Sequence, residues 1–291
     1  MSGDLFQTKG AYRVGDFEVC AVSDGQFTVP LTQAFMPEVP LETVREALEQ
    51  ASLPTEKFTT TFNPLLVRRG GSLTLIDTGF GPDAAQRSGS TMGFLVSNLA
   101  AFGISPKDIN VVIISHCHPD HVGGLVGADG LIFPNAEIAV PRIEWDFWTN
   151  DAEKAKASPG RMTELFAMNQ RVLSAIREKN RIYDWGKEVL PGLEAIGTPG
   201  HSIGHTSFLI QSGGDQVFIQ SDLTSLEALF VRHPEWTAFF DQDPALAVST
   251  RKRIYDMLAT EHLRVQGFHH PGPGLNCVEK HGTGYVLVPA L

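Results

Sequence analysis

Cysteine is scarce in this sequence, and long apolar runs are missing from it. The 291 residues include three cysteines, Cys20, Cys117 and Cys277, and no CxxC pair. This odd, sparse set argues against a disulfide framework and fits a reducing compartment. No apolar run approaches the ~18 residues of a membrane span, and the first residues lack the apolar core of a signal peptide. We therefore expect a cytoplasmic protein without a membrane partner.

Basic clusters are missing as well. The formal net charge is −10 and the sequence pI is about 5.4. Lysine and arginine gather only in short stretches such as 68–69 and 251–253. Because nucleic-acid binding needs a concentrated basic surface, we expect no nucleic-acid partner. The chain also lacks a GxSxG sequence, which disfavours a serine hydrolase.

The patterns that are present indicate a layered α/β protein. Hydrophobic residues make up 42% and charged residues 19% of the chain, which is typical of a globular protein. Alternation over residues 11–31 around the turn signal Ser23-Asp24-Gly25 predicts a β-hairpin. Helical spacing predicts helices at 41–51, 91–103, 161–179 (expected to be the longest) and 243–260, with strands between them. No linker divides the chain, so we expect one domain over residues 1–291, with the hairpin as an N-terminal extension.

Metal-capable side chains are concentrated after one buried strand. The motif HCHPDH (116–121) directly follows the apolar run VVIIS (111–115). Alternate residues of an extended chain point the same way, so His116 and His118 can share one metal ion. A turn at Pro119 would carry Asp120 and His121 to a neighbouring position, and zinc accepts both imidazole nitrogen and carboxylate oxygen. The intervening Cys117 points away from the metals and is expected to pack in the core.

The motif resembles the HxHxDH signature of the metallo-β-lactamase-fold metallohydrolase superfamily. Other motifs that resemble those of the family follow in family order: LIDTG (75–79), GTPGHSIGH (197–205), SDL (221–223) and GFHHPGPG (267–274). The sequences TTTFNPLLV, FPNAE and DQDPALAVSTRKR are most similar to the methyl parathion hydrolase-like and lactonase-like branch. The resemblance spans most of the chain and implies an αβ/βα four-layer sandwich, with two mixed β-sheets flanked by helices.

The resemblance also implies a site for two divalent metal ions. It assigns His116, His118 and His201 to one ion, Asp120, His121 and His269 to the other, and Asp222 to a bridge between them. The family pattern favours His269 over the adjacent His270 as the ligand. Asp77 and His205 fall where relatives support the ligands. The mixed nitrogen and oxygen ligands favour zinc and leave manganese, iron or cobalt open.

This ligand set predicts a hydrolase that needs no protein nucleophile. Two ions roughly 3.5–4 Å apart can hold a bridging water whose pKa falls toward ~7, and the resulting hydroxide can attack a carbonyl or phosphoryl centre. Asp120 and Asp222 are the predicted catalytic residues. Metallo-β-lactamases proper generally carry a cysteine in place of Asp222, which disfavours antibiotic hydrolysis.

The expected substrates are small, neutral, apolar esters, namely lactones, aryl esters or organophosphate triesters. Aromatic residues close to the motifs are predicted to line an apolar pocket for them: Phe80, Phe94, Trp145, Trp148, Phe230 and Phe268. Lactonases that act on acyl-homoserine lactones often have a tyrosine three residues after the bridging aspartate. Ser225 occupies that position here, which argues against this particular substrate.

Three alternatives remain open from the sequence. A glyoxalase II-like thioesterase has the same seven ligands, although basic glutathione-binding residues are not evident near EKHGTG (279–284). A mononuclear-iron sulfur dioxygenase or a non-catalytic metal-binding protein could use the same fold. Analogy with relatives also suggests a homodimer.

Overall fold

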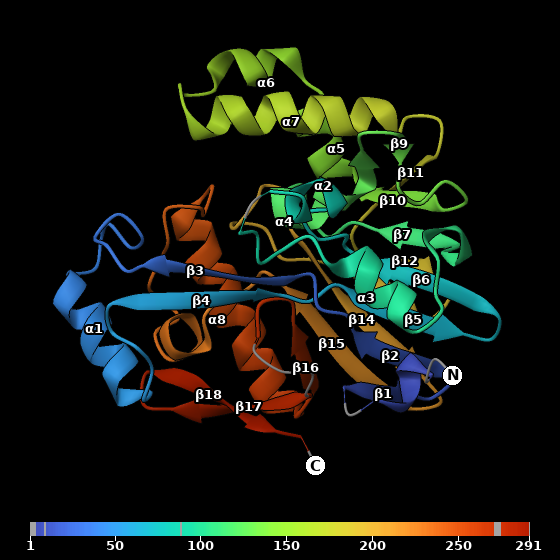
Figure 1. The fold of residues 1–291 in the computed structure, drawn as a ribbon. Coiled ribbons are helices and arrows are strands. Elements are labelled where there is room, and N and C mark those ends of the chain that lie inside the picture. Colours follow the sequence, from blue (N-terminus) through green and yellow to red (C-terminus); the bar gives the residue numbers. More distant parts are fainter. Residues whose placement is uncertain (1–3, 9, 88, 271–274, 291) are drawn as a thin grey trace.

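Two seven-stranded mixed β-sheets form the centre of the protein (Figure 1). The computed structural model describes residues 4–8, 10–87, 89–270 and 275–290. In spatial order, the first sheet consists of β1 (Ala11–Val14), β2 (Phe17–Ala21), β5 (Leu65–Arg69), β6 (Ser72–Ile76), β7 (Val111–Ile113), β10 (Glu137–Pro141) and β11 (Asn180–Tyr183). The second consists of β12 (Lys187–Leu190), β13 (Leu193–Gly197), β14 (Thr206–Ser212), β15 (Asp215–Ser221), β16 (Arg264–Gly267), β17 (Asn276–His281) and β18 (Gly284–Pro289).

Strand direction brings several strand ends to one place. In the first sheet, β6, β7, β10 and β11 run parallel to one another, whereas β1, β2, β5 and β6 pair antiparallel. In the second sheet, β15 and β16 are parallel, and β13 has the same direction because β14 pairs antiparallel with both β13 and β15. The carboxyl ends of parallel strands meet at one edge of a sheet, which is where open α/β sheets place their ligand sites.

Apolar residues between the two sheets form the central core. Phe208 and Ile210 of β14 alternate with outward residues and share one buried cluster with Val19 and Val67 of the first sheet. Burying a side chain of this kind contributes roughly 1.5–3 kcal/mol. The period-two pattern read from the sequence therefore fixes which faces of the sheets meet.

Helices lie on the outer faces of both sheets, at strand ends and at the far end of the ribbon described below (Figure 1). They are α1 (Leu41–Gln50), α2 (Pro82–Ala85), α3 (Leu95–Ala101), α4 (Pro119–Val122), α5 (Arg142–Trp148), α6 (Asp151–Lys156), α7 (Arg161–Ala175) and α8 (Pro244–Glu261), with short turns η1 (Leu5–Gln7), η2 (Pro106–Asp108), η3 (Gly123–Leu125) and the π-helical η4 (Glu227–Val231). Phe166 of α7 packs in one cluster with Ile138 of β10, and Ile254 of α8 packs with Val265 of β16. The predicted sandwich of helices and two mixed sheets is confirmed. None of the described helices is both long and apolar enough to cross a bilayer.

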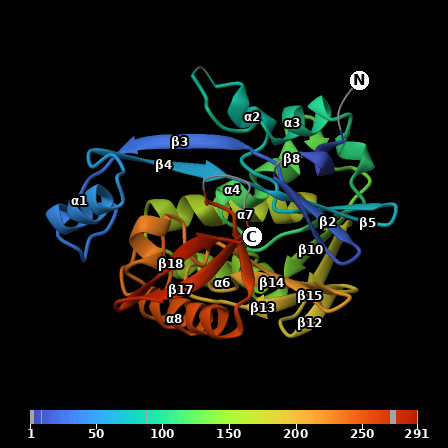
Figure 2. The same cartoon turned by 90° about the horizontal axis from the view of Figure 1, so that it is seen from below.

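A two-stranded ribbon projects from the sandwich. Strands β3 (Gly25–Pro30) and β4 (Lys57–Phe62) pair antiparallel with each other, and α1 lies at their far end (Figure 2). A smaller ribbon pairs β8 (Val126–Gly127) with β9 (Gly130–Leu131). The long ribbon supplies one wall of the pocket described below.

Two predictions about local structure are wrong. The hairpin predicted over 11–31 turns at Gly15-Asp16, where β1 meets β2, while residues 25–30 pair with β4 instead. Gly15 has a φ of +53°, the left-handed conformation that a tight turn needs and glycine adopts without strain. The longest described helix is the 18-residue α8, not the helix at 161–179, whose α-helical part ends at Ala175.

The apparent turn signal at Asp24 is a buried anchor. Its carboxylate accepts hydrogen bonds from the backbone N–H groups of Phe80, Gly93 and Leu95, at 2.9, 3.2 and 2.9 Å. Burial raises the pKa of Asp24, and these three hydrogen bonds oppose the rise. The residue thereby ties the start of the ribbon to the loop after β6 and to α3.

Replacing Asp24 tests this anchor. Asp24→Ala leaves three N–H groups without an acceptor, so we expect the free energy of unfolding to fall by about 3 kcal/mol or more in urea denaturation. Asp129→Ala, an exposed aspartate in a turn, is the matched control and should change stability by less than about 0.5 kcal/mol. Equal stability of the two variants would contradict the anchoring role.

Candidate metal centre

Seven buried or nearly buried side chains converge at the shared edge of the two sheets. They form two groups, His116, His118 and His201 in one, and Asp120, His121, Asp222 and His269 in the other. Within each group the candidate donor atoms all lie within 4.8 Å of one another. All seven residues were assigned to the metal site from the sequence motifs, and the structure brings all of them together.

The first group is built by two strand ends. His116 and His118 follow β7, and His201 follows β13. His118 Nδ1 lies 3.0 Å from His116 Nε2 and 2.9 Å from His201 Nε2. Burial lowers the pKa of His116 and of His118 well below the ordinary value, which keeps both rings in the neutral form that binds metals.

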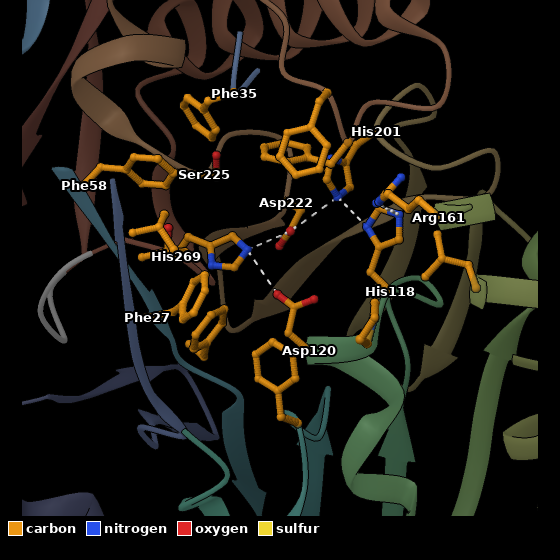
Figure 3. Close-up of a pocket in the computed structure, with 18 of the residues that line it drawn as sticks. Phe27, Phe35, Phe58, His118, Asp120, Arg161, His201, Asp222, Ser225 and His269 are labelled. Atoms are coloured by element: carbon orange, nitrogen blue, oxygen red, sulfur yellow. Dashed lines mark hydrogen bonds and ion pairs between the residues drawn. The ribbon is translucent and has the colours of Figure 1, made fainter. Parts of the chain in front are cut away.

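The second group combines carboxylates with imidazoles. His269 Nε2 lies 2.8 Å from Asp222 Oδ2 and 3.5 Å from Asp120 Oδ2. Asp222 Oδ2 also lies 3.4 Å from His201 Nε2 in the first group, so this carboxylate touches both groups (Figure 3). Burial alone would lower the pKa of His121, but the surrounding carboxylates, Asp222 foremost, raise it well above its ordinary value.

Two orphaned atoms show that this arrangement fits a cation. His121 Nε2 and Asp222 Oδ1 are buried and 3.2 Å apart, close enough for an ion pair, yet neither makes a hydrogen bond within the described part of the chain. Buried polar atoms without a partner are costly, so they indicate a missing partner. Imidazole nitrogen and carboxylate oxygen are the donors that zinc and similar divalent ions accept. The residues present therefore fit two divalent metal ions.

The backbone adopts the left-handed conformation at two strand ends, next to or at the aspartates Asp77 and Asp222. Asp77, directly after β6, has a φ of +63°, and Ser221, directly before Asp222, has a φ of +50°. Non-glycine residues rarely adopt this conformation, and it is concentrated at functional sites. The β15–β16 pairing also shifts register between Ile219 and Ser221. These distortions turn the chain so that Asp222 enters the cluster.

Acceptors behind the cluster hold four of the five candidate ligand imidazoles. His121 Nδ1 lies 2.8 Å from Asp77 Oδ2, and His201 Nδ1 lies 3.1 Å from Asp241 Oδ1. His116 Nδ1 lies 3.1 Å from the Ser115 hydroxyl, and His269 Nδ1 lies 2.8 Å from the Thr61 carbonyl oxygen. Such partners fix ring orientation and raise ligand basicity. Asp77 was expected in this role, whereas Asp241 was missed, because its partner His201 is 40 residues away in the chain.

His205 and His270 lie behind the cluster rather than in it. His205 Nε2 accepts the backbone N–H of Asp222 at 3.0 Å, and its Nδ1 faces Thr198, so both ring nitrogens are used. Burial lowers the pKa of His205 to about 3. His270 Nε2 faces the side chain of Gln220 at 2.7 Å, away from the carboxylates. Residues 271–274 of the same motif lie outside the described residues.

One buried carboxylate, missed by the sequence analysis, joins the two histidine loops. Glu144 Oε2 accepts from Cys117 N–H at 2.9 Å and Trp148 Nε1–H at 2.7 Å, and Oε1 accepts from Ser202 Oγ–H and Gly204 N–H, both at 2.7 Å. All four partners are donors, so only a carboxylate satisfies them. The available signal was an acidic residue, Glu144, in the aromatic stretch IEWDFW (143–148), which also contains the exposed Asp146. Cys117 itself packs in the core, as predicted.

An apolar pocket of about 630 Å³ opens above the two groups. Phenylalanines from the ribbon and from distant loops form most of its wall: Phe27, Phe35, Phe58, Phe62, Phe80, Phe239 and Phe240. One face of α7 supplies Arg161, Glu164, Leu165 and Met168. Figure 3 shows Phe27, Phe35 and Phe58 on one side of the pocket and Arg161 beside His118 on the other.

Of the six aromatic residues predicted to line this pocket, the structure places only Phe80 in the described wall. The other five are near the motifs in sequence but pack elsewhere. Trp148 is fully buried beside Glu144, Phe230 lies under α1, and Trp145 packs against the helix side of the first sheet. Phe94 caps the start of α3. The ring of Phe268 packs against His121, with centroids 4.1 Å apart.

Comparison with known proteins agrees with this geometry. Residues 63–254 match the profile of the Metallo-beta-lactamase superfamily. The N-acyl homoserine lactonase AiiA of Bacillus thuringiensis subsp. kurstaki is 30% identical over 205 residues, which cover 64% of this chain and 72% of that protein. The lactonase AttM of Agrobacterium fabrum is 31% identical over 118 residues, 40% of this chain and 41% of AttM.

Solved structures give the same result. AidC, described as a dizinc quorum-quenching lactonase in complex with the product N-hexanoyl-L-homoserine, superposes with a TM-score of 0.88 at 30% identity, over 97% of both chains. The hydrolase AbOPH of the beta-lactamase superfamily has a TM-score of 0.85 at 28% identity, also over 97% of both chains. The chain belongs to the metallo-beta-lactamase superfamily, as the motifs predicted. Within it, the chain is a metal-dependent hydrolase of the lactonase-like branch.

Glu144 provides a test of how the metal centre is positioned. In Glu144→Gln, the amide NH₂ group faces two donors that it cannot accept from, so the two loops lose their common anchor. We expect metal affinity to fall by about 10- to 100-fold, measured by competition with a chromophoric chelator. Glu178→Gln, at an exposed position, is the control. Unchanged affinity in the Glu144 variant would show that the loops hold their geometry without it.

Proposed function

We propose that this protein is a zinc-dependent lactonase for lactones that carry an apolar chain. The observation that carries the proposal is the position of the two donor groups at the floor of an aromatic pocket of about 630 Å³. A pocket of this size can enclose most of a small ligand, and its apolar wall favours a hydrocarbon chain. The N-acyl homoserine lactonases among the relatives and the dizinc site of AidC support the same substrate class and metal.

We assign the seven side chains to two zinc ions. His116, His118 and His201 would hold the first, and Asp120, His121 and His269 the second. Asp222 would serve both, since its Oδ2 atom lies 3.4 Å from His201 Nε2 and 2.8 Å from His269 Nε2. When bound, the ions supply a water acidic enough to act as hydroxide near neutral pH and a positive charge that polarises the acyl oxygen.

The protein's own side chains prepare the remaining steps. Asp222 is held by the hydrogen bond from its backbone N–H to His205. The Asp120 carboxylate lies in the pocket wall and is 15% exposed, and neighbouring imidazoles outweigh its burial and lower its pKa. It is therefore ionised and can accept the proton of the attacking water and return it to the leaving alkoxide. The aromatic wall excludes bulk water from the acyl carbon.

A substrate panel tests the proposal. The panel comprises γ-decalactone, N-decanoyl-homoserine lactone, a p-nitrophenyl ester, a paraoxon-type triester and S-lactoylglutathione, assayed with zinc-reconstituted wild type and Asp222→Ala. We expect the two lactones to have the highest kcat/KM and about two zinc ions per chain. In Asp222→Ala we expect a loss of activity of about a hundredfold or more, because this carboxylate contacts both groups.

The outcomes separate the alternatives. Turnover confined to the thioester would favour the glyoxalase II-like hypothesis, and one iron per chain with oxygen consumption on persulfides would favour the dioxygenase. Asp146→Ala, an exposed aspartate outside both groups, is the matched control and should retain activity. Fast triester hydrolysis without lactone hydrolysis would assign the protein to the organophosphate triesters instead.

Strand β4 separates the aromatic pocket from a second cavity of about 690 Å³. Thr60 and Phe62 line the first cavity, Thr59 and Thr61 line the second, and Phe58 lines both. The ring of Phe58 packs on Phe35, with centroids 4.2 Å apart. Ser225 borders both cavities with a buried hydroxyl that has no hydrogen-bond partner among the described residues.

Removing the Phe58 ring should therefore join the two cavities. We expect Phe58→Ala to move the preferred acyl chain of the lactone substrate to longer lengths, measured as kcat/KM over a C4 to C14 series. Phe27→Ala, at the 43% exposed rim of the same ribbon, is the control. It should weaken binding of all chain lengths without moving the optimum. An unmoved optimum in Phe58→Ala would mean that the second cavity takes no part in chain selection.

A further inference from the structure

Arg161 places a positive charge in a largely apolar pocket wall. It is the first residue of α7, and with Glu164, Leu165 and Met168 it forms the face of that helix that lines the pocket. Its guanidinium carbon lies 5.7 Å from the ring centroid of Phe239, which also lines the pocket. The residue is half-buried. A charge in this position needs a reason, because transfer from water into an apolar wall is costly.

No carboxylate of the described residues pairs with this guanidinium. None of their carboxylate oxygens lies within 4.0 Å of it, including that of Glu164 on the same face. Among the described residues, its one polar hydrogen-bond contact is with His118 Nε2, at 3.4 Å. Burial lowers the pKa of Arg161, and the more distant Asp120 and Asp241 oppose that shift, but an arginine remains charged throughout the physiological range.

The contact with His118 does not satisfy Arg161 either. His118 Nδ1 is the atom that faces His116 and His201, so it is the atom through which His118 would bind the first metal ion. A neutral imidazole that uses the Nδ1 lone pair carries its proton on Nε2. His118 Nε2 and the guanidinium are then two donors side by side. With the proton on Nε2, the 3.4 Å contact between them satisfies neither donor, and both residues line the pocket (Figure 3).

This donor pair borders the pocket in which the products of hydrolysis would form. Opening a lactone adds one water across the acyl C–O bond and yields a hydroxyl group, a carboxylate and a proton. During hydrolysis the acyl carbon would lie beside the two groups of metal-ligand residues. Arg161 lies 3.4 Å from His118, which belongs to the first of these groups. The guanidinium fork matches a carboxylate in two parallel hydrogen bonds.

We propose that Arg161, with His118 Nε2–H beside it, binds the acyl oxygen that becomes the product carboxylate. The proposal rests on the hydrolytic function assigned above and adds a substrate- and product-binding residue to it. It assigns the apolar chain to the phenylalanine wall and the oxygen-bearing end of the molecule to the α7 side. It also implies that the ring-opened acid inhibits the enzyme more strongly than a neutral analogue does.

The test compares 4-hydroxydecanoate with 4-hydroxydecanamide as ligands of the zinc-loaded protein by isothermal titration calorimetry. Wild type should bind the acid more tightly than the amide. In Arg161→Met, we expect affinity for the acid to fall about tenfold or more, while affinity for the amide changes little. Arg161→Lys should keep part of the preference, because it retains the charge but loses the fork. Arg171→Met, at an exposed position of α7, is the matched control.

Each outcome decides the matter. If wild type binds acid and amide equally, or if Arg161→Met keeps the full preference at unchanged zinc content, the proposal is overturned and the metals alone hold the carboxylate. If Arg161→Met fails to fold by circular dichroism, Arg161→Gln replaces it in the comparison. Turnover of γ-decalactone by wild type tests the proposed function separately. An active lactonase whose acid affinity ignores Arg161 would overturn this inference alone.

Discussion

The protein depends on holding several buried imidazoles and carboxylates in one place without leaving them free to turn. Each group loses its water on burial, and four of the five imidazoles have a fixed acceptor on the side away from the cluster. Asp77 and Asp241 supply that partner for two imidazoles, and Glu144 fixes the loops that carry three of them. These acceptors behind the cluster form an outer set that fixes the direction of the metal-ligand side chains, the inner set. The order and direction of the strands bring both sets to the same edge of the two sheets.

The sequence predicted the inner set well and the outer set poorly, for a physical reason. The metal-ligand residues of the inner set occur in short motifs. In a motif such as 116–121, the spacing of the residues indicates which side chains point the same way. Glu144 and Asp241 act through partners up to 60 residues away, and no local pattern records such a contact. Asp77 was found only because it belongs to a motif at a strand end. Asp24 was predicted to lie in a turn, because an aspartate before glycine is typical of a turn whether its carboxylate faces water or three backbone N–H groups.

The residues that line the pocket were also predicted poorly from the sequence. Aromatic residues close to the motifs were expected to line it, yet Trp148 and Phe268 turn their rings behind the metal centre. Apart from Phe80, the wall comes from the β3–β4 ribbon, Phe35, one face of α7 and residues 239–240, which are all remote in sequence from HCHPDH. Secondary structure and metal donors are therefore largely local properties of this chain. The shape of the substrate site arises only when distant segments pack.

Strand β4 contributes both to the pocket wall and to the support of a metal-ligand histidine, and it does so from alternating positions. Phe58 and Phe62 face the aromatic pocket, while the Thr61 carbonyl between them holds the ring of His269. A slip of one residue along the ribbon would turn the phenylalanines outward and withdraw that carbonyl at the same time. A substitution on β4 can thus reshape the pocket and leave this carbonyl in place, whereas an insertion or deletion between positions 58 and 62 would displace the pocket side chains and the carbonyl together.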